Sequence, residues 1–217
     1  MYKKVWKRML DIVLSLIALV ILGIPMLIVA LLILIDMGSP VIFKQNRIGL
    51  NNKEFKLLKF RSMTDARDEN GVFLPDSERV TKLGKFIRTT SIDELPSLIN
   101  IIKGDMSIIG PRPLPTRYLD RYTEEQKKRH DVRPGLSSPS VVKGRNMLTW
   151  EEQFEGDVWY VENVSFATDV KSVIDTVKIV LTREGATASD GEARGEFIGI
   201  ADAESLKVDA EGSYMKL

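Results

Sequence analysis

Asp93 and Glu94 stand side by side in the segment RTTSIDELPSLINIIKGDMSIIGPRP, residues 88–113. A carboxylate at a helix N-terminus lies beside free backbone N–H groups, stays ionised and can attack phosphorus, as in enzymes that form aspartyl-phosphates. The next side chain along a helix points about 100° away, so it could hold a magnesium ion instead. The pair therefore predicts phosphoryl-transfer chemistry.

The same residues also fit a purely structural role. Ser91 could cap a helix while Glu94 reaches back to it, which is the capping-box pattern. Pro96 argues against a role limited to helix capping. It would be the fifth residue of such a helix, and it has no N–H to donate to the helical hydrogen bonds.

Basic side chains surround the pair in the sequence. Arg88 and Arg112 flank it, and Lys59 and Arg61 precede it on a predicted strand. The planar guanidinium suits phosphate oxygens, and the prolines on both sides of Arg112 fix the backbone that carries it. Any one of these cations taken alone is more often a solvated surface charge.

Composition excludes several classes of protein. The chain has 217 residues and no cysteine, which rules out disulfides, thiolate zinc sites and a cysteine nucleophile. His130 is the single histidine of the sequence, which argues against a Ser-His-Asp triad and against a multi-histidine metal site. A bound metal is therefore expected to have oxygen ligands, as Mg²⁺ does.

The N-terminal part of the chain is basic and apolar. Residues 1–61 hold ten Lys and Arg against three Asp and Glu, although the whole chain has a net charge of +1. Together with a long apolar run, this indicates contact with anionic membrane phospholipids and not with nucleic acid.

The apolar run extends from Ile12 to Ile35 without a charge. A straight helix of that length measures about 36 Å, enough to cross a hydrocarbon core of roughly 30 Å. Pro25 interrupts it and basic residues flank both ends, so we favour a re-entrant helix bent at Pro25, with both ends in the cytoplasm. A plain membrane span and a cleaved signal peptide are the alternatives.

The rest of the sequence predicts an α+β, mainly helical fold. Two short strands, 41–44 and 54–60, form a hairpin, and the polar loop 64–84 is a possible lid. Helices are expected at 86–102 (interrupted near Pro96), 118–130, 150–165 and 166–183. We divide the chain into the membrane helix (1–40), a small cytoplasmic catalytic domain (41–183) and an acidic, solvated tail (184–217).

Several quoted segments resemble one family. The block RTTSIDELPSLINIIKGDMSIIGPRPL, with FKLLKFRSM before it and RHDVRPG…GRN after it, is similar to the bacterial sugar transferases, the monotopic phosphoglycosyl transferases. The resemblance is greatest to members that transfer phospho-N,N'-diacetylbacillosamine in bacterial protein N-glycosylation.

The resemblance implies a Mg²⁺-dependent enzyme on the cytoplasmic face of the bacterial inner membrane, with amphipathic helices at the membrane surface. It implies that Asp93 attacks a UDP-sugar, UMP leaves, and undecaprenyl phosphate takes the phosphosugar, with Asp93 and Glu94 near the metal. Lys59 and Arg88 would meet lipid phosphate, and Arg112 and Arg145 the nucleotide phosphates. The product would pass to downstream glycosyltransferases.

The sequence departs from the family at RPGLSSPSVVKGRN, where serine, proline, valine and lysine (Ser138, Pro139, Val141, Lys143) replace a glycine, an apolar or aromatic residue and two amides. Ile24 also replaces the serine that often precedes the kink proline. The altered segment leaves a non-catalytic membrane-bound scaffold open as an alternative. A second alternative is the same reaction with another sugar, a hexose-phosphate transferase for exopolysaccharide or O-antigen.

Overall fold

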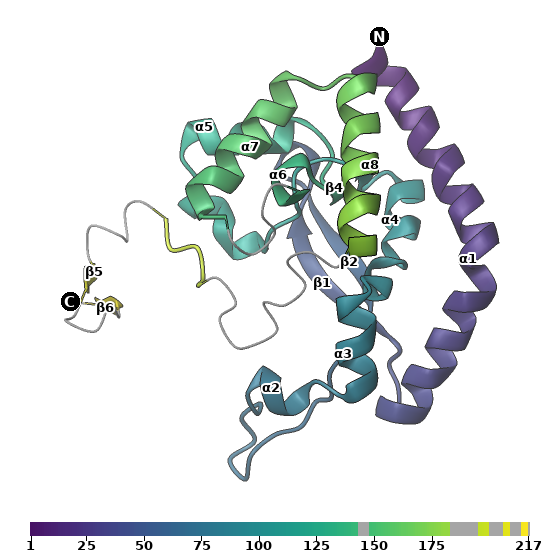
Figure 1. Cartoon of the computed structure of the whole chain (residues 1–217). Coiled ribbons are helices and arrows are strands. Elements are labelled where there is room, and N and C mark those ends of the chain that lie inside the picture. The colour runs from purple at the N-terminus through teal and green to yellow at the C-terminus, as the bar shows by residue number, and fades with distance from the viewer. Residues whose placement is uncertain (143–147, 183–194, 200–205, 209–213, 217) are drawn as a thin grey trace.

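The computed structural model describes residues 1–142, 148–182, 195–199, 206–208 and 214–216 (Figure 1). The α-helices are α1 (Lys7–Met37), α2 (Asp76–Arg79), α3 (Lys82–Thr89), α4 (Ser97–Lys103), α5 (Glu124–Lys127), α6 (Pro139–Val142), α7 (Trp150–Glu162) and α8 (Phe166–Thr182). The strands are β1 (Ile42–Ile48), β2 (Glu54–Phe60), β3 (Ser107–Ile109), β4 (Gly135–Ser137), β5 (Leu206–Val208) and β6 (Tyr214–Lys216). A π-helical turn η1 (Tyr2–Trp6) and four 3₁₀ turns, η2 (Leu50–Asn52), η3 (Ile92–Glu94), η4 (Thr116–Arg121) and η5 (Lys128–Asp131), complete the order.

The predicted hairpin is present. β1 and β2 pair antiparallel from Ile42 opposite Phe60 to Ile48 opposite Glu54, so the first strand extends four residues beyond the prediction. Asn51 and Asn52 have positive φ and make the turn, a conformation that asparagine tolerates. The remaining sheets are also two-stranded: β3 and β4 pair parallel, and β5 and β6 antiparallel.

The helix predictions met mixed outcomes. α7 and α8 confirm the two C-terminal helices, and the break expected near Pro96 separates α3 from α4 through the η3 turn. The prediction of a single helix over 118–130 is wrong, because the η4 turn ends at Arg121 and a new helix, α5, begins after its N-cap residue Thr123. Its side chain forms a capping box with Gln126, and the buried Tyr118 and Tyr122 precede it.

Helix α7 carries four aromatic residues, Trp150, Phe154, Trp159 and Tyr160, which could lie at a membrane interface or in the domain core. Phe154 and Tyr160 are buried, and Trp150 packs against the cluster that contains Phe154. Trp159 is half exposed. Packing inside the domain therefore accounts for most of this group.

The long helix α1 is held to the domain near both of its ends (Figure 1). Near its start, Arg8 donates hydrogen bonds to the carbonyls of Ile101 and Ile102 in α4. Near its end, Ile33 is fully buried against Phe60 and Ile87. α1 continues as an α-helix through Pro25 and bows as it runs along the domain.

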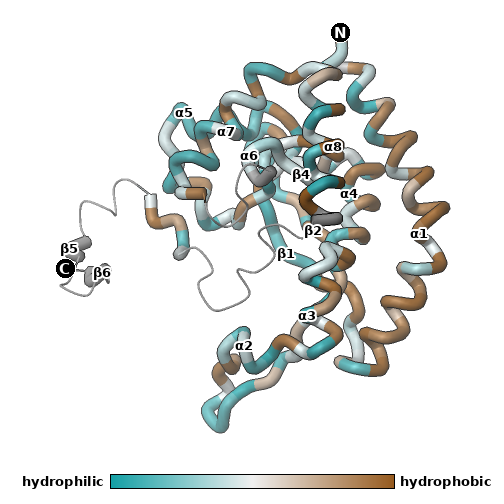
Figure 2. The backbone as a smooth tube through the Cα atoms, viewed as in Figure 1, coloured by the Kyte–Doolittle hydropathy of each residue, from teal (hydrophilic) through white to brown (hydrophobic). Residues whose placement is uncertain are grey.

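The middle of α1 exposes a strongly apolar face. Val20, Ile24 and Leu27 are exposed, and brown colour follows the helix for most of its length (Figure 2). An apolar groove lies between this part of α1 and Phe60 of β2. The chain thus has one described helix long and apolar enough to cross a membrane, and its length and composition are compatible with membrane association.

Asp169 of α8 connects the N-terminal turn to the domain. Its carboxylate accepts hydrogen bonds of 2.6 Å each from Tyr2 Oη, Lys7 Nζ and Tyr160 Oη. The spacing of Asp11 from Lys7 and Arg8 in the sequence predicts an ion pair between neighbouring turns of the helix. In the structure Lys7 pairs with Asp169 instead, and Asp11 is buried and accepts a hydrogen bond from the Ile108 amide at 3.0 Å. Asp11 therefore serves as a tertiary contact.

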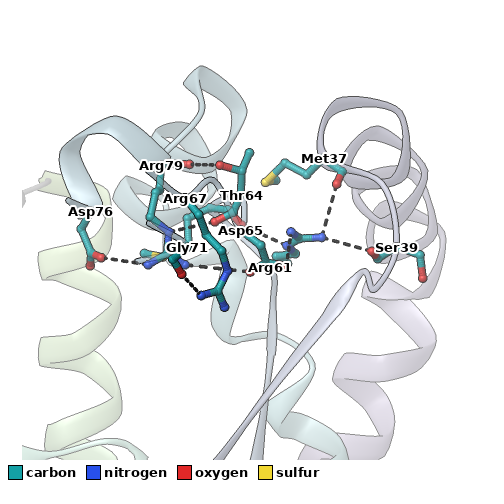
Figure 3. Close-up of polar contacts among 10 residues, drawn as sticks. Met37, Ser39, Arg61, Thr64, Asp65, Arg67, Gly71, Asp76 and Arg79 are labelled. Carbon is teal, nitrogen blue, oxygen red and sulfur yellow. Dashed lines mark hydrogen bonds and ion pairs between the residues drawn. The ribbon is translucent and has the colours of Figure 1, made fainter. Parts of the chain in front are cut away.

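The polar segment 64–84 is folded, with isolated bridges that join Met63 to Val80 and Arg67 to Phe73. Figure 3 shows Arg61 at its base, where the guanidinium donates to the carbonyls of Met37 and Ser39 and forms an ion pair of 2.8 Å with Asp65. Among the described residues that line the pocket at Asp93-Glu94, none comes from this segment. The lid interpretation stays a prediction.

The expectation of a solvated tail over 184–217 is wrong for one stretch. Residues 195–199 lie against the domain, and Phe197 is buried in an aromatic cluster. The average composition of the tail is acidic and does not reveal that Phe197 is buried.

Candidate active site

Asp93 and Glu94 lie in the η3 turn between α3 and α4. Ser91 precedes them with a φ of 57° and makes no side-chain cap hydrogen bond, so the capping-box alternative is wrong. Instead, Glu94 Oε1 lies 2.7 Å from Lys59 Nζ, and Asp93 Oδ2 lies 3.6 Å from the same nitrogen. Arg112 Nη2 is 3.6 Å from Glu94 Oε1. The local turn thus presents both carboxylates to a pair of cations.

Two polar side chains of α4 fix Lys59 opposite the turn. Ser97 Oγ donates to the carbonyl of Leu58 at 2.8 Å. Asn100 accepts from the Leu58 amide at 3.0 Å and donates to the Lys56 carbonyl at 2.9 Å. Both are buried, and each satisfies backbone groups on the free edge of β2. The strand is therefore fastened to the helix that follows the carboxylates, which sets the position of Lys59.

Asp93 occupies a mostly buried position, with its side chain 13% exposed. Burial raises the pKa of Asp93 above its ordinary value; the Lys59 charge opposes this rise, Glu94 adds to it, and Arg112 and Arg88 also oppose it. The neighbouring cations therefore offset part of the effect that burial has on the pKa of this carboxylate.

A small pocket opens beside Glu94. Its walls include Arg47, Lys59 and Arg112, together with Pro113 and the β4 residues Gly135 and Leu136. Sequence reasoning missed Arg47, whose guanidinium donates to the Pro113 carbonyl at 3.2 Å. Its Nε is buried and has no hydrogen-bond partner within the described residues. Burial and the neighbouring Arg112 lower the pKa of Arg47 to about 10, so it remains charged at neutral pH.

Arg47 and Arg112 give this pocket a positive wall. Two arginines and a lysine around an opening beside two carboxylates can bind an anion such as a diphosphate, because guanidinium groups match phosphate oxygens. Arg47 could have been identified only from a longer first strand, because it lies near the end of β1 and the partner strand carries Lys59. The sequence pattern predicted that this strand ends at residue 44.

A buried ion pair, Arg129 with Asp157, holds the backbone carbonyl of Arg112. Arg129 donates from Nη2 to the Arg112 carbonyl at 2.8 Å and to Asp157 Oδ2 at 2.6 Å. Ser140 Oγ donates to Asp157 Oδ1 at 2.8 Å, and Ser138 Oγ at 3.3 Å. Two of the serines in the altered segment therefore bind a buried carboxylate, which gives that segment a structural role.

The other predicted site residues have different outcomes. Arg88 lies in electrostatic reach of Asp93, and its Nε donates to Ser62 Oγ at 2.7 Å. The structure thus brings together Lys59, Arg88 and Arg112 around the carboxylates. Arg145 lies outside the described residues.

The apolar groove along α1 is linked to this site through neighbouring residues in the sequence. Its wall includes Phe60, which follows Lys59 on β2, and Met26, Leu27 and Ala30 of α1. Ile92 and Leu95, on either side of the carboxylate pair, pack on the cluster of Ile33 and Phe60. The carboxylates therefore sit next to the helix that carries the apolar surface.

Comparison with known protein families identifies the chain. The model of the bacterial sugar transferase family matches residues 2–183, most of the sequence. The chain belongs to the bacterial sugar transferase family. This family assignment makes it an enzyme of sugar transfer, and the matched range includes Asp93 and Glu94.

Three relatives show what this sugar transferase is similar to. The uncharacterized sugar transferase EpsL of Bacillus subtilis is 46% identical over 199 residues, covering 92% of this chain and 98% of that protein. The galactosyl transferase CpsE of Streptococcus agalactiae is 40% identical and covers 83% of this chain. A UDP-N-acetylgalactosamine-undecaprenyl-phosphate N-acetylgalactosaminephosphotransferase of Aeromonas hydrophila is also 40% identical over 83% of this chain.

The last two relatives are longer proteins. This sugar transferase spans 43% of the length of CpsE and 44% of the length of the Aeromonas protein. The activities in the names of these two relatives are those of the whole, longer proteins.

Proposed function

We propose that this sugar transferase moves a phosphosugar from a UDP-sugar to undecaprenyl phosphate through a covalent intermediate on Asp93. The observation that carries the proposal is the Asp93–Glu94 pair, which faces Lys59 and Arg112 beside an apolar helix. The name of the Aeromonas relative, which includes both substrates, supports it.

The reaction has two displacements at one phosphorus. First, a carboxylate oxygen of Asp93 bonds to the phosphorus that carries the sugar, and the bond from that phosphorus to the bridging oxygen breaks, so UMP leaves. Second, an oxygen of undecaprenyl phosphate attacks the same phosphorus and the carboxylate leaves. The product is undecaprenyl diphosphate sugar, and Asp93 returns unchanged, as ping-pong chemistry requires.

The side chains divide the work by position. Lys59 and Arg112 neutralise the two carboxylates in the free enzyme and would bind phosphate oxygens once the diphosphate enters. Arg47 and Arg112 line the pocket that would take the nucleotide phosphates. Lys59 precedes Phe60, which lines the apolar groove, and Arg88 donates to Ser62 Oγ; we propose that these two cations meet the acceptor phosphate.

The two carboxylates suit a Mg²⁺ ion that takes its remaining ligands from water and substrate phosphates. Clusters of three metal-ligating side chains are absent from the described part of the chain, so the protein would supply few ligands. When bound, the ion would neutralise charge that develops on the transferred phosphoryl group. Glu94 would hold it while Asp93 attacks.

We further propose that α1 enters one leaflet and returns, with the domain on the cytoplasmic face of the inner membrane. Contacts near both ends support this, since Arg8 binds α4 and Ile33 packs against Phe60 and Ile87. A spanning helix would carry one end away from the domain. The exposed apolar residues Phe166, Val170 and Ile174 of α8 would lie at the membrane surface beside α1.

The proposed sugar is N-acetylated, such as diacetylbacillosamine or N-acetylgalactosamine. The name of the Aeromonas relative supports an N-acetylated sugar, whereas the name of CpsE favours the hexose alternative. Turnover of a panel of UDP-sugars decides between them.

The test is UMP release from UDP-sugar in the presence of undecaprenyl phosphate and Mg²⁺. Asp93→Asn should abolish UMP release and the mass increase of the protein by one phosphosugar, while Asp76→Asn, a matched change at an exposed carboxylate, should preserve both. Normal UMP release by Asp93→Asn would refute the nucleophile assignment. Absence of turnover by the folded wild-type protein with every UDP-sugar would favour a non-catalytic scaffold.

A further inference from the structure

The segment Gly195–Gly199, with the sequence GEFIG, lies beyond the residues that match the family, yet it packs into the domain. Phe197 is 4% exposed, and its ring centre lies 4.9 Å from that of Phe154. The side chains that surround it are Ile48, Leu114, Tyr118, Tyr122, Trp150 and Phe154. The pocket is therefore lined by residues of β1, η4 and α7, elements of the family domain.

The domain also binds the backbone of the segment. Trp150 Nε1 donates to the Gly195 carbonyl at 3.0 Å, and the Phe197 amide donates to Tyr118 Oη at 3.3 Å. Arg121 donates to the Phe197 carbonyl. Side chains that hold both the ring and the flanking peptide groups are typical of a peptide-binding site, because they fix the direction of the bound chain.

Charge and shape complete the recognition. Glu196 Oε1 lies 2.8 Å from Arg117 Nε and 2.9 Å from Arg121 Nη1. Gly199 has a φ of +81°, and a Cβ there would lie 3.1 Å from Arg121 Cβ and 3.2 Å from the Arg121 carbonyl. The segment thus combines an acid that pairs with two arginines, an aromatic ring that fills the pocket, and a glycine where a side chain would crowd Arg121.

The docking pocket is joined to the candidate active site. The Ile48 amide donates to the Leu114 carbonyl at 3.1 Å, so β1 is fastened to the chain just before η4. The neighbouring Arg47 donates to the Pro113 carbonyl at 3.2 Å, and both residues line the pocket beside Glu94. Phe197 packs on Ile48 and Leu114, so it supports this wall from the opposite side.

We propose that the domain carries a binding site for an acidic–aromatic peptide, and that the chain's own residues Gly195–Gly199 occupy it. The docked segment acts as a positioning device, because it holds the wall that presents Arg47 and Arg112 to the substrate phosphates. The positioning part rests on the proposed function, whereas the docking itself does not.

The experiment uses the full chain with Trp6→Phe and Trp159→Phe, which leaves Trp150 as the single tryptophan and as a reporter of docking. Phe197→Ala should shift Trp150 emission to longer wavelength, since the indole loses its neighbour. In the active enzyme we expect the KM for UDP-sugar to rise about three- to tenfold while kcat changes less than about twofold. Adding the free peptide Gly-Glu-Phe-Ile-Gly to this variant should reverse both effects, and Gly-Glu-Ala-Ile-Gly should not.

A second variant tests docking without changing the buried aromatic core. Glu196→Arg changes a half-exposed side chain, should weaken docking in the same direction, and should be partly rescued by Arg117→Glu in the same chain. Unchanged Trp150 emission in both Phe197→Ala and Glu196→Arg, or failure of the Phe-containing peptide to bind the folded variant, would overturn the docking site. Loss of docking, seen as the shift in Trp150 emission, together with a normal KM in both variants would overturn the positioning role. Failure of the wild type to release UMP would remove the proposed function, while the emission measurements would still test the docking.

Discussion

The buried pair of Arg129 and Asp157 offers a sharp test of how the site is supported. The two side chains are 1% and 0% exposed, and Arg129 reaches one carboxylate oxygen through Nε at 3.1 Å and Nη2 at 2.6 Å. Asp157→Ala leaves the guanidinium buried without its counter-charge, and it deprives Ser140 of an acceptor. Breaking such a pair by removing one partner costs about 3–5 kcal/mol of stability.

The expected loss is large enough to measure in detergent or nanodiscs. For a domain of this size each kcal/mol lowers Tm by about 2–4 °C, so Asp157→Ala should lower it by roughly 6–20 °C. Thermal unfolding followed by circular dichroism gives the value. Glu124→Ala, which breaks the exposed ion pair with Lys127, is the matched control and should change stability by less than about 0.5 kcal/mol.

The double variant Arg129→Met/Asp157→Leu separates charge from packing. Because both charges are gone, it should recover a large share of the loss seen in Asp157→Ala. A single-variant cost below about 1 kcal/mol, or a double variant as unstable as the two single losses added together, would refute the reasoning from an unpaired buried charge. The double variant should still raise the KM for UDP-sugar, since the Arg112 carbonyl loses its donor.

Three further predictions follow from the fold. Lys59→Met removes a charge that lowers the pKa of Asp93, so the acid limb of the pH–rate profile should move to higher pH, whereas Lys59→Arg should keep it in place. Asp11→Ala leaves the Ile108 amide without its acceptor and should cost about 1–3 kcal/mol in urea unfolding. Gly84→Ala should lower both stability and activity, because its Cβ would lie 1.9 Å from the Ser62 carbonyl oxygen; Gly23→Ala, with open space around it, is the control.

The sequence was informative where function depends on neighbours in the chain. Asp93 and Glu94 are adjacent, and the turn that presents them is local, so their pairing with nearby cations could be predicted. Lys59 was also found because a short hairpin strand has a clear pattern. Even there the capping box was a strong competitor, and only the left-handed Ser91 and the contact of Glu94 with Lys59 decide against it.

The supporting contacts could not be predicted, because they join distant parts of the chain. Asn100 binds the edge of β2, and Arg129 meets Asp157 across η5 and α7, with no local pattern that marks either contact. Asp11 looked like a surface acid because its tertiary partner, the Ile108 amide, is invisible in sequence. The burial of Phe197 could not be predicted, because the average composition of the tail around it is acidic.

Arg61 connects the end of the long apolar helix α1 to the strand of Lys59. Its guanidinium holds the carbonyls of Met37 and Ser39, and it follows Lys59 by two residues along the chain. On the proposed placement of α1 in one leaflet, a tilt of the helix in a thicker or thinner lipid environment would pull on this arginine and, through it, on the ammonium group between the two acids. Lipid acyl-chain length would thereby tune turnover without any lipid touching the reacting atoms.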